Sequence, residues 1–433
     1  MSKVEFQKRR QQIMKMIESH SMIIIPSAPL RNRSRDIGYR FRQDSDFYYL
    51  TGFDEPNSLL ALVPGRPEGE FIIFCQERDK IKEQWEGKRN GPEGAMSDFN
   101  AHDAYPIEDI DEILPVLLKS KKYIYYPMYR DSDFDTKINS WMNLKDVKQQ
   151  NNQHQQELIS LDHLLHDMRL FKSKAEVTAM RKAAKIAVRA HENAIKKVRP
   201  NMFEYELESE FIYEFRKFNA EHSYNPIVGG GANACILHYA SNDAELMDGD
   251  LVLIDAGCEA DYYASDITRT FPVNGRFSQA QLDIYNIVLE AQLSAINKVR
   301  KGNHFNDPHR EAVKVITSGL RDLGLLHGKI SELIENEAYR RFFMHRTGHW
   351  IGMDVHDVGD YKVDEEWRFF ENGMITTIEP GIYIGNEKDI PKSYRNIGIR
   401  IEDMVLVKNN TPEVLSHSLV KDPDAIELMM NAQ

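Results

Sequence analysis

Four acidic residues lie at the ends of predicted strands, where their side chains could gather. Asp255 directly follows the apolar run 251–254, and Asp266 lies in the next predicted strand, which begins near Tyr262. A turn at 260–261 would place the two aspartates directly opposite each other, with Cβ atoms roughly 5 Å apart. Buried and unpaired, they would repel at a cost of several kcal/mol. A cation between them or a proton held by the pair would remove that conflict.

A second pair of acidic residues repeats this pattern further along the chain. The apolar run 374–378 ends in Glu379, and the predicted strand 397–401 ends in Glu402. A loop centred on residues 390–391 would bring Glu379 opposite Glu402 on one strand face. The two acidic hairpins therefore look like two related halves of one structure.

Between the two acidic pairs, a short segment is rich in histidine. His345, His349 and His356 fall within twelve residues. This is not the HExxH zinc motif, because Arg346 follows His345. Two glycines in the segment also argue against one continuous helix. A single histidine is more often structural than a ligand, but three beside four patterned carboxylates favour ligation.

Four carboxylates and an imidazole are the ligands that two divalent cations need. Oxygen-rich ligation with one nitrogen suits Mn²⁺, with Co²⁺, Fe²⁺ or Zn²⁺ as alternatives. Two such ions lie about 3.5–4 Å apart and clamp a hydroxide between them, which predicts a hydrolase with a dinuclear metal centre. The alternative is a structural pair of hairpins in which Arg269 and Arg400 form salt bridges with the acids.

Arg400 is the basic residue closest in sequence to Glu402 on its strand. It precedes Glu402 by two residues and therefore lies on the same strand face. We expect its guanidinium to hold Asp255 by a charge-assisted hydrogen bond. The alternative is an ordinary surface arginine.

The elements that would position these residues begin with a mixed N-terminal region. For 433 residues, about 150 residues per domain predicts two to three domains. Residues 1–20 have the pattern of an amphipathic helix. From residue 22 to about 141, short apolar strands alternate with turns and one possible helix at 107–119. We therefore expect one N-terminal α/β domain.

The composition changes in the middle of the chain. Residues 149–156 are polar and nearly uncharged, which is typical of a surface loop or linker. Residues 173–176 then form a capping-box pattern that opens a long helix. We expect one domain over 1–172 and a second over 173–433, which mixes long helices with strands. The predicted fold class is a two-domain α/β (α+β) protein.

Composition and charge exclude several classes of protein. A hydrophobic share of 42% and a charged share of 28% are those of a globular chain. No apolar run approaches the roughly 20 residues of a membrane helix, and the mixed N-terminus lacks a secretory signal pattern. The net charge of −12 opposes nucleic-acid binding. Because Cys75, Cys235 and Cys258 form no CxxC pair, we expect a cytoplasmic protein without a disulfide framework.

These motifs resemble those of the pita-bread metallopeptidases of family M24, and within them most closely those of the bacterial aminopeptidase P family. Five separated motifs carry the resemblance in the family's order, at residues 254–257, 265–272, 348–352, 378–381 and 398–403. The likeness extends to residues 39–53, 235–239 and 353–359. It therefore covers nearly the whole chain, and it implies a pita-bread catalytic domain after an aminopeptidase P-type N-terminal domain.

The resemblance implies two Mn²⁺ ions and a defined reaction. One ion would be held by Asp255, Asp266 and Glu402, and the other by Asp266, His349, Glu379 and Glu402. The implied activity is that of an Xaa-Pro aminopeptidase, which releases the N-terminal residue from peptides with proline in second position. A hydroxide that bridges the ions would attack the scissile carbonyl.

Further residues receive roles by the same resemblance. Glu379 is the candidate for moving a proton, and His345 and His356 are placed to hydrogen-bond the substrate and the developing oxyanion. His238 would line the pocket for the proline ring. Trp85 resembles an N-terminal-domain tryptophan that reaches a neighbouring subunit's site; the alternative is an ordinary core or surface aromatic. The family suggests homodimers or homotetramers.

Other functions remain open from sequence. A prolidase shares the five metal ligands but cleaves only Xaa-Pro dipeptides, and it would need a basic group for the dipeptide carboxylate. Some family members also hydrolyse organophosphates. A non-catalytic peptide-binding protein and a creatinase-like hydrolase are disfavoured, because chains of these kinds lack the metals, whereas here all five ligands are present.

Overall fold

The computed structural model describes residues 1–143, 156–409 and 411–432. Contacts divide the chain into two compact units, Met1–Met168 and Arg169–Gln433. The boundary expected after residue 172 falls in the segment that follows the last helix of the first unit, and it stays a prediction. Of the linker expected at 149–156, only Gln156 lies within the described residues.

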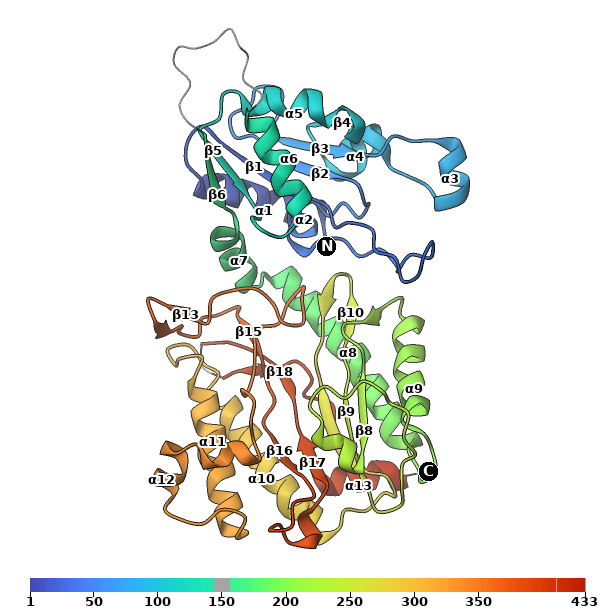
Figure 1. Cartoon of the computed structure of the whole chain (residues 1–433), viewed down its shortest axis with the longest axis vertical. Helices are drawn as coiled ribbons and strands as arrows, with labels where there is room; N and C mark the ends of the chain where they lie inside the picture. Colours follow the sequence, from blue (N-terminus) through green and yellow to red (C-terminus); the bar gives the residue numbers. More distant parts are fainter. Residues whose placement is uncertain (144–155, 410, 433) are drawn as a thin grey trace. The chain divides into compact units, whose positions relative to one another are not determined.

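The N-terminal unit is built on a sheet that, in the described residues, has six strands in the order β4-β3-β2-β1-β5-β6 (Figure 1). The strands are β1 (Ser21–Pro26), β2 (Leu59–Leu62), β3 (Phe71–Cys75), β4 (Asp103–Pro106), β5 (Tyr123–Tyr126) and β6 (Glu157–Ser160). The helices are α1 (Lys3–Met16), α2 (Ser45–Thr51), α3 (Lys80–Glu86), α4 (Gly91–Phe99), α5 (Ile110–Leu118), α6 (Ser132–Asn143) and α7 (Asp162–Leu170), with the 3₁₀ turn η1 (Ile107–Asp109) before α5.

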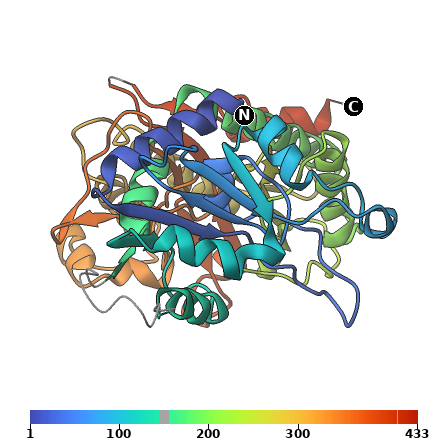
Figure 2. The same ribbon diagram turned by 90° about the horizontal axis from the view of Figure 1, so that it is seen from above.

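Helices cover both faces of this sheet (Figures 1 and 2). On one face, Ile24 of β1 belongs to the same buried cluster as Leu114 of α5 and Trp141 of α6. On the other face, the guanidinium of Arg10 in α1 lies 3.8 Å from the ring centre of Phe71 in β3. Coverage of both faces explains why the strands are continuous apolar runs rather than alternating ones. The predicted α/β character and both predicted helices of this region are confirmed.

The C-terminal unit mixes long helices with short strands, as predicted. Its helices are α8 (Lys174–Lys197), α9 (Glu204–Lys217), α10 (Gln279–Ile296), α11 (Asp307–Asp322), α12 (Ile330–Glu335) and α13 (Pro423–Asn431), with 3₁₀ turns η2 (Gly231–Cys235), η3 (Ala338–Arg341) and η4 (Lys392–Tyr394). Its strands are β7 (Glu221–His222), β8 (Ile227–Gly230), β9 (Leu251–Asp255), β10 (Cys258–Ala260), β11 (Tyr263–Ala264), β12 (Thr268–Pro272), β13 (Lys362–Val363), β14 (Glu366–Trp367), β15 (Ile375–Ile378), β16 (Gly381–Ile384), β17 (Ile397–Arg400), β18 (Asp403–Leu406) and β19 (Glu413–Val414).

Two halves of similar construction make up this unit (Figure 1). In the first half, α8 and α9 pack against the strands β7, β8, β10 and β11. In the second half, α10 packs against β15, β16 and β17, and α11 packs along α10. The predicted capping box opens α8, because the side chains of Ser173 and Glu176 each accept a hydrogen bond from the other's backbone N–H. Each half contributes one of the acidic hairpins.

The register predicted for the first acidic pair is wrong by two residues. Strand β9 pairs with β12 so that Asp255 lies opposite Thr268 rather than Asp266. The chain turns at Asp261 and Tyr262, one residue later than predicted, and both residues have positive φ. Because side chains alternate with a period of two, a shift of two residues keeps every side chain on its predicted face. Asp255 and Asp266 therefore still point to the same side of the hairpin.

The register predicted for the second acidic pair is confirmed. Strand β16 pairs with β17 so that Gly381 lies opposite Arg400. Strands β15 and β18 continue the same register on the other side of the acidic residues. Glu379 consequently lies opposite Glu402, in the short gap between the two strand pairs.

Hydrogen bonds join the two acidic hairpins. The Thr270 hydroxyl donates to the Arg400 carbonyl at 3.1 Å and accepts from the Arg400 backbone N–H at 3.2 Å. The backbone N–H of Glu402 donates to the Thr268 carbonyl at 3.1 Å. These contacts bring β12 beside β17, so that acids from both halves can face one another.

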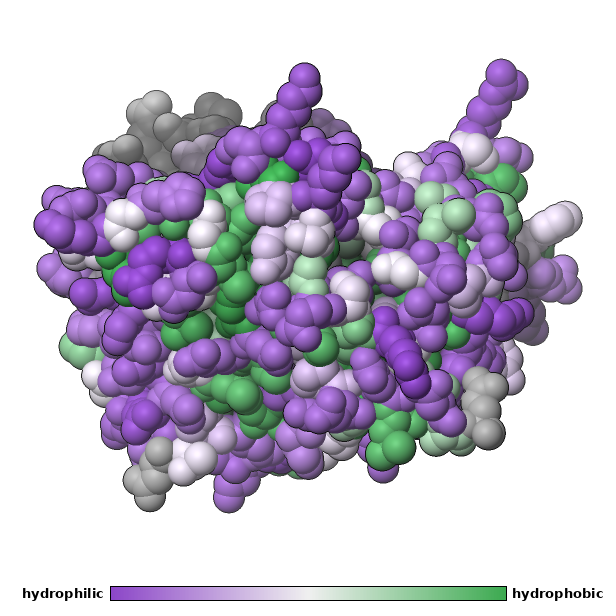
Figure 3. All heavy atoms as spheres, turned by 90° about the horizontal axis from the view of Figure 1, so that it is seen from below, coloured by the Kyte–Doolittle hydropathy of each residue, from purple (hydrophilic) through white to green (hydrophobic). Residues whose placement is uncertain are grey.

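No helix in the described part of the chain combines the length and the apolar character that crossing a membrane requires. On the face drawn in Figure 3, hydrophilic side chains predominate and hydrophobic ones lie between them.

Replacing Gly257 with alanine should destabilise the C-terminal unit. A Cβ at this position would lie 1.7 Å from the Ser265 carbonyl oxygen, a backbone atom that cannot turn away. We expect a loss of about 3 kcal/mol in the free energy of unfolding, measured by chemical denaturation. Gly38→Ala is the control, because its Cβ would approach only the Arg31 carbonyl oxygen at 3.6 Å. Equal stabilities of Gly257→Ala and the wild type would contradict the observed hairpin.

Candidate functional site

One cavity of about 1000 Å³ in the C-terminal unit contains nearly all of the residues expected from sequence. Its lining includes Asp255, Asp266, Glu379, Glu402, Arg400, His238, His345, His349 and His356. Cavities of this size are typical of ligand sites. Among the expected residues only Trp85 lies elsewhere, on α3 of the N-terminal unit, with its side chain 86% exposed. That exposure excludes the alternative of a core aromatic.

Each of the four acidic residues lies where a strand pairing ends. Asp255 is the last residue of β9, and Asp266 lies between β11 and β12. Glu379 lies between β15 and β16, and Glu402 between β17 and β18. Because the regular ladders stop at these positions, the chain can bend and turn all four carboxylates into the cavity.

The two aspartates share a tyrosine, and one of them also pairs with an arginine. The Tyr224 hydroxyl lies 2.6 Å from Asp266 Oδ1 and also contacts Asp255 Oδ1. Arg400 Nη2 donates to Asp255 Oδ2 at 2.7 Å, which confirms the predicted charge-assisted hydrogen bond. One hydroxyl hydrogen and one guanidinium neutralise only part of the charge of this pair.

Each of the two glutamates has a threonine hydroxyl as its hydrogen-bond partner. The Thr268 hydroxyl donates to Glu402 Oε2 at 2.7 Å. The Thr377 hydroxyl lies 3.4 Å from Glu379 Oε1. Neither glutamate is paired with a lysine or arginine in the described part of the chain, since no such ion pair is present. Their charges therefore remain to be offset.

His349 points one ring nitrogen at these carboxylates. Its Nδ1 lies 2.9 Å from the Trp350 carbonyl oxygen, and a carbonyl can only accept, so Nδ1 carries a proton. Nε2 is thereby directed toward Asp266 Oδ2 at 3.4 Å and Glu379 Oε1 at 3.6 Å. A backbone carbonyl that fixes the tautomer in this way is typical of a histidine that binds a metal through Nε2.

Glu379 and Glu402, two of the crowded carboxylates, retain protons when no metal is bound. Burial raises the pKa of Glu379 to about 7, although the positive charge of His349 lowers it. Burial and the charges of Asp266 and Glu379 raise the pKa of Glu402 well above its usual range. For His349 burial disfavours the charged form, but the hydrogen bond with Asp266 and the charges of Glu379 and Asp266 together outweigh it, and the pKa rises to about 9. All three residues thus hold protons that a cation would displace.

The donor set fits divalent cations. Ligand atoms of Asp266, His349 and Glu402 all lie within 4.8 Å of one another, as required for a shared ion. The set contains four carboxylates and one imidazole, and carboxylates can bridge two ions. The guanidinium of Arg400 offsets only part of the negative charge of the four acids, and the rest is left for metal ions.

A chain of hydrogen bonds connects Arg400 with His345. Arg400 Nη1 donates to the Tyr383 hydroxyl at 2.9 Å, and that hydroxyl lies 2.8 Å from His345 Nε2. His345 Nδ1 lies 2.7 Å from the Arg346 carbonyl, so it carries the proton. Burial and the charge of Arg400 lower the pKa of His345 to about 4. His345 is therefore neutral, and Tyr383 donates to its Nε2.

The other two histidines lie exposed on the cavity wall. His238 follows η2, and His356 lies with its ring centre 4.4 Å from that of His349. Within the described residues, no group hydrogen-bonds the ring of His356. His356 therefore has free ring nitrogens in the cavity, unlike His345.

Sequence reasoning missed three polar residues of the site, Tyr224, Thr268 and Tyr383. The register of the second hairpin contained a signal for Tyr383, because alternation places it on the face of Glu379. Thr268 lies two residues after Asp266, on the same face as the aspartates. Tyr224 precedes β8 and reaches the aspartates only through the pairing of β8 with β9, which no local pattern indicates.

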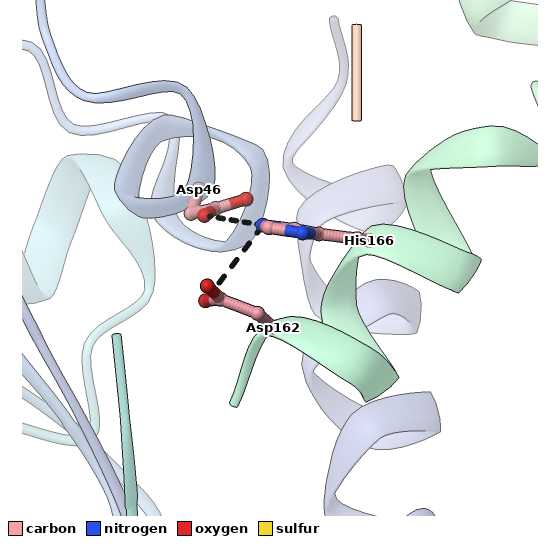
Figure 4. Close-up of side chains that lie close together, drawn as sticks. All are labelled: Asp46, Asp162 and His166. Atoms are coloured by element: carbon pink, nitrogen blue, oxygen red, sulfur yellow. Dashed lines mark hydrogen bonds and ion pairs between the residues drawn. The ribbon is translucent and has the colours of Figure 1, made fainter. Parts of the chain in front are cut away.

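A second group of acids and histidine lies in the N-terminal unit (Figure 4). His166 Nε2 lies 3.3 Å from Asp46 Oδ2 and 3.7 Å from Asp162 Oδ1. Arg130 already supplies positive charge there, because it donates to Asp46 and Asp162, each at 2.7 Å. This group joins α2 and α7, and its geometry is explained by a salt-bridge network.

Comparison with known proteins gives consistent matches over the whole chain. Residues 178–409 match metallopeptidase family M24, and residues 6–125 match the N-terminal domain of aminopeptidase P. An Xaa-Pro aminopeptidase of Haemophilus influenzae is 44% identical over 99% of this chain and 97% of its own length. An Xaa-Pro aminopeptidase of Escherichia coli is 43% identical over 100% of this chain and 98% of its own length.

Solved structures agree with these sequence matches. An aminopeptidase of Pseudomonas aeruginosa has a TM-score of 0.98 and 51% identity, with 100% of this chain and 98% of that chain covered. Aminopeptidase P of Escherichia coli with the inhibitor Pro-Leu has a TM-score of 0.96 and 43% identity, with 100% and 99% covered. The predicted combination of an aminopeptidase P-type N-terminal domain and a pita-bread C-terminal domain is confirmed.

Binding of Mn²⁺ should release protons, and the affinity should rise as the pH increases through about 7. The reason is that raised pKa values of Glu379, Glu402 and His349 keep protons on groups that must lose them to ligate. Isothermal titration calorimetry in two buffers of different ionisation enthalpy measures this release. Glu379→Gln should release fewer protons. An affinity that does not change with pH, with equal heats in both buffers, would contradict the raised pKa values.

Proposed function

The chain belongs to metallopeptidase family M24, and we propose that it acts as an Xaa-Pro aminopeptidase. Such an enzyme releases the N-terminal residue from peptides with proline in second position. The observation that carries the proposal is the gathering of Asp255, Asp266, His349, Glu379 and Glu402 in one cavity. The names of relatives more than 40% identical over nearly the full length support the substrate class.

The proposed substrate has a distinctive scissile bond. The nitrogen of proline belongs to a tertiary amide and carries no N–H, so a peptidase that needs this donor handles the bond poorly. Recognition must therefore use the carbonyl oxygen, the ring and the free amino terminus. The cavity offers acids for the amino terminus and a wall that includes His238 and His356 for the rest.

Two Mn²⁺ ions are the proposed cofactors, with Co²⁺, Fe²⁺ or Zn²⁺ as alternatives. Asp255, Asp266 and Glu402 would hold one ion, and Asp266, His349, Glu379 and Glu402 the other. When bound, the two ions supply Lewis acidity toward the scissile carbonyl and the bridging hydroxide that the family resemblance implies.

Glu379 is the proposed carrier of a proton during the reaction. Glu379 would hold only one of the two ions, so one of its carboxylate oxygens is left to accept and release a proton. Its side chain is 18% exposed to the cavity, whereas that of Asp266 is 7% exposed. Of these two acids, Glu379 is thus the more accessible to a substrate.

His345 and His356 are the proposed hydrogen-bond partners of substrate and oxyanion. The free ring nitrogens of His356 suit this role directly. His345 uses both ring nitrogens in the contacts with Arg346 and Tyr383. Because Nε2 accepts from Tyr383, His345 can donate there to a substrate oxygen only after it has lost the Tyr383 contact and gained a proton at Nε2.

Buried ion pairs position the loop that carries His356. Arg169 Nη2 donates to Asp357 Oδ1 at 2.6 Å and to Asp354 Oδ2 at 2.8 Å. Lys172 Nζ donates to Asp357 Oδ2 at 3.0 Å, and both side chains of this second pair are 1% exposed. Since these acids flank His356 in sequence, the ion pairs fix its backbone.

A homo-oligomer and a cytoplasmic location are further proposals. Trp85 extends from the short helix α3 and is 86% exposed, which suits a side chain that a neighbouring subunit buries. Cys75, Cys235 and Cys258 are free thiols, as in proteins of a reducing compartment. Analytical ultracentrifugation of the wild type and of Trp85→Ala addresses the assembly.

Asp266→Asn should abolish most of the activity. Loss of a proposed bridging carboxylate should lower bound Mn²⁺ and reduce kcat/KM for an Xaa-Pro-Xaa tripeptide by more than about 100-fold, since even outer-shell changes can cost that much. Metal analysis and steady-state assays with and without added Mn²⁺ measure both effects. Asp322→Asn is the control, because its side chain is 61% exposed and its salt bridge is with the adjacent Arg321.

The same assay separates the proposed activity from that of a prolidase. An aminopeptidase of this kind cleaves the tripeptide, whereas a prolidase cleaves only the Xaa-Pro dipeptide. Full metal content and full tripeptide activity in Asp266→Asn would refute the proposed metal centre. Cleavage of the dipeptide alone by the wild type would refute the proposed substrate class.

Lys172→Met should lower kcat/KM by about tenfold when His356 is present. Loss of the ion pair with Asp357 should displace His356, and small displacements of a group that contacts the substrate lower activity steeply. In a His356→Ala background, the same change should have little further effect on kcat/KM, since Lys172 acts through His356. Lys172→Arg keeps the charge and should retain most of the activity. Full additivity of the two losses, in variants with equal metal content, would mean that Lys172 acts by another route.

A further inference from the structure

Two basic side chains lie against one tryptophan in the cavity wall. The guanidinium carbon of Arg346 lies 4.7 Å from the ring centre of Trp367, and Lys362 Nζ lies 5.2 Å from it. All three residues line the cavity that contains the acidic cluster. Lys362 and Trp367 are directly opposite each other in the β13–β14 hairpin. We call these three residues the basic wall.

Arg346 differs from the other arginine of the cavity. Arg400 is buried and pairs with Asp255, so its charge is already used. Arg346 forms no ion pair with any carboxylate among the residues that the structure describes, and its one side-chain hydrogen bond there goes to the amide oxygen of Asn306. A guanidinium has five N–H donors, so most of those of Arg346 remain available.

The positive charge of Lys362 is also only weakly offset by carboxylates. Its nearest carboxylate is Glu365 at 4.0 Å, and that side chain is 97% exposed. Asp360 also lines the cavity and contributes one negative charge nearby. An ion pair as exposed as that of Lys362 is worth little, so the basic wall retains net positive charge.

The tryptophan in contact with these two cations is packed against other aromatic rings. The ring of Trp367 stacks on that of Phe305, with ring centres 6.2 Å apart and an angle of 25° between planes. Phe305 in turn contacts Trp350 and Tyr361, with ring centres 4.5 Å and 4.7 Å away. Trp350 is fully buried. The cation–π contacts therefore hold Arg346 and Lys362 on a fixed platform rather than on a mobile surface.

We propose that the basic wall, chiefly Arg346, is a subsite for a carboxylate of the peptide substrate. The inference rests on the proposed aminopeptidase function and names a substrate class for the same cavity. A short peptide is positive at its amino terminus and negative at its carboxyl end, and the cavity offers an acidic cluster and an unpaired guanidinium. A planar guanidinium can bind a carboxylate through two parallel hydrogen bonds.

The carboxylate can come from two sources. In a tripeptide it is the C-terminal carboxylate of the residue after proline, and in a longer peptide it is the side chain of Asp or Glu at that position. Three peptides distinguish them: Ala-Pro-Ala as the free acid, Ala-Pro-Ala as the C-terminal amide, and Ala-Pro-Glu as the C-terminal amide.

The test compares kcat and KM of the Mn²⁺-loaded wild type and Arg346→Met on these three peptides. We expect the KM of Arg346→Met to rise about tenfold for a peptide whose carboxylate reaches the wall, as for loss of a hydrogen bond to a charged group. The kcat should change little, and Ala-Pro-Ala amide should be unaffected. Arg346→Lys keeps the positive charge but loses the two parallel N–H donors of the guanidinium, so its KM should lie between those of the wild type and Arg346→Met.

Arg310→Met is the matched control. It removes the same charge from an exposed arginine on α11 that does not line the cavity, so all three peptides should keep their KM. A rise in the KM of Arg346→Met that is confined to the free acid assigns the subsite to the C-terminal carboxylate. A rise confined to the glutamyl amide assigns it to the side-chain carboxylate. Equal effects of Arg346→Met on all three peptides, or none, would overturn the subsite. If the wild type cleaves none of them, including the amide, the proposed function fails instead.

Discussion

Mutual repulsion among four crowded carboxylates governs how the site of the C-terminal unit is built. Asp255, Asp266, Glu379 and Glu402 are brought together by two hairpins, and in the described part of the chain a single guanidinium, that of Arg400, pairs with one of them. Left without further positive charge, such a group either keeps protons or moves apart. The raised pKa values of Glu379 and Glu402 show that these two carboxylates keep protons. Divalent cations offset the repulsion while leaving the carboxylates ionised and the hairpins in place.

The fold separates the acids that are needed in the cavity from those that stabilise the core. Glu402 and Asp403 are adjacent in sequence, so strand alternation sends their side chains to opposite sides. Asp403 is fully buried and pairs with Arg269 at 2.7 Å and Lys421 at 2.7 Å, so its charge is satisfied. The structural salt bridge that sequence allowed for Arg269 thus exists. It lies in the core, on the strand face opposite Glu402, and therefore does not neutralise the acids of the site.

Local patterns predicted much of this arrangement because strand side chains alternate with a period of two. The faces of all four acids followed from that period, as did the place of Arg400 beside Asp255. The first register was two residues out because the turn at Asp261 and Tyr262 has positive φ without a glycine, so the sequence lacked the usual signal. Tyr224 could not be predicted, because its contact with the aspartates depends on strand pairing between distant segments.

The presence of two metal ions among these carboxylates is tested most sharply by the anomalous scattering of manganese in crystals grown with Mn²⁺. Two peaks should appear inside the cavity, within ligand distance of Asp266, Glu402 and His349, with the carboxylates turned toward them. A cavity without anomalous density at saturating Mn²⁺, with the same carboxylates turned to solvent or paired through protons, would contradict it.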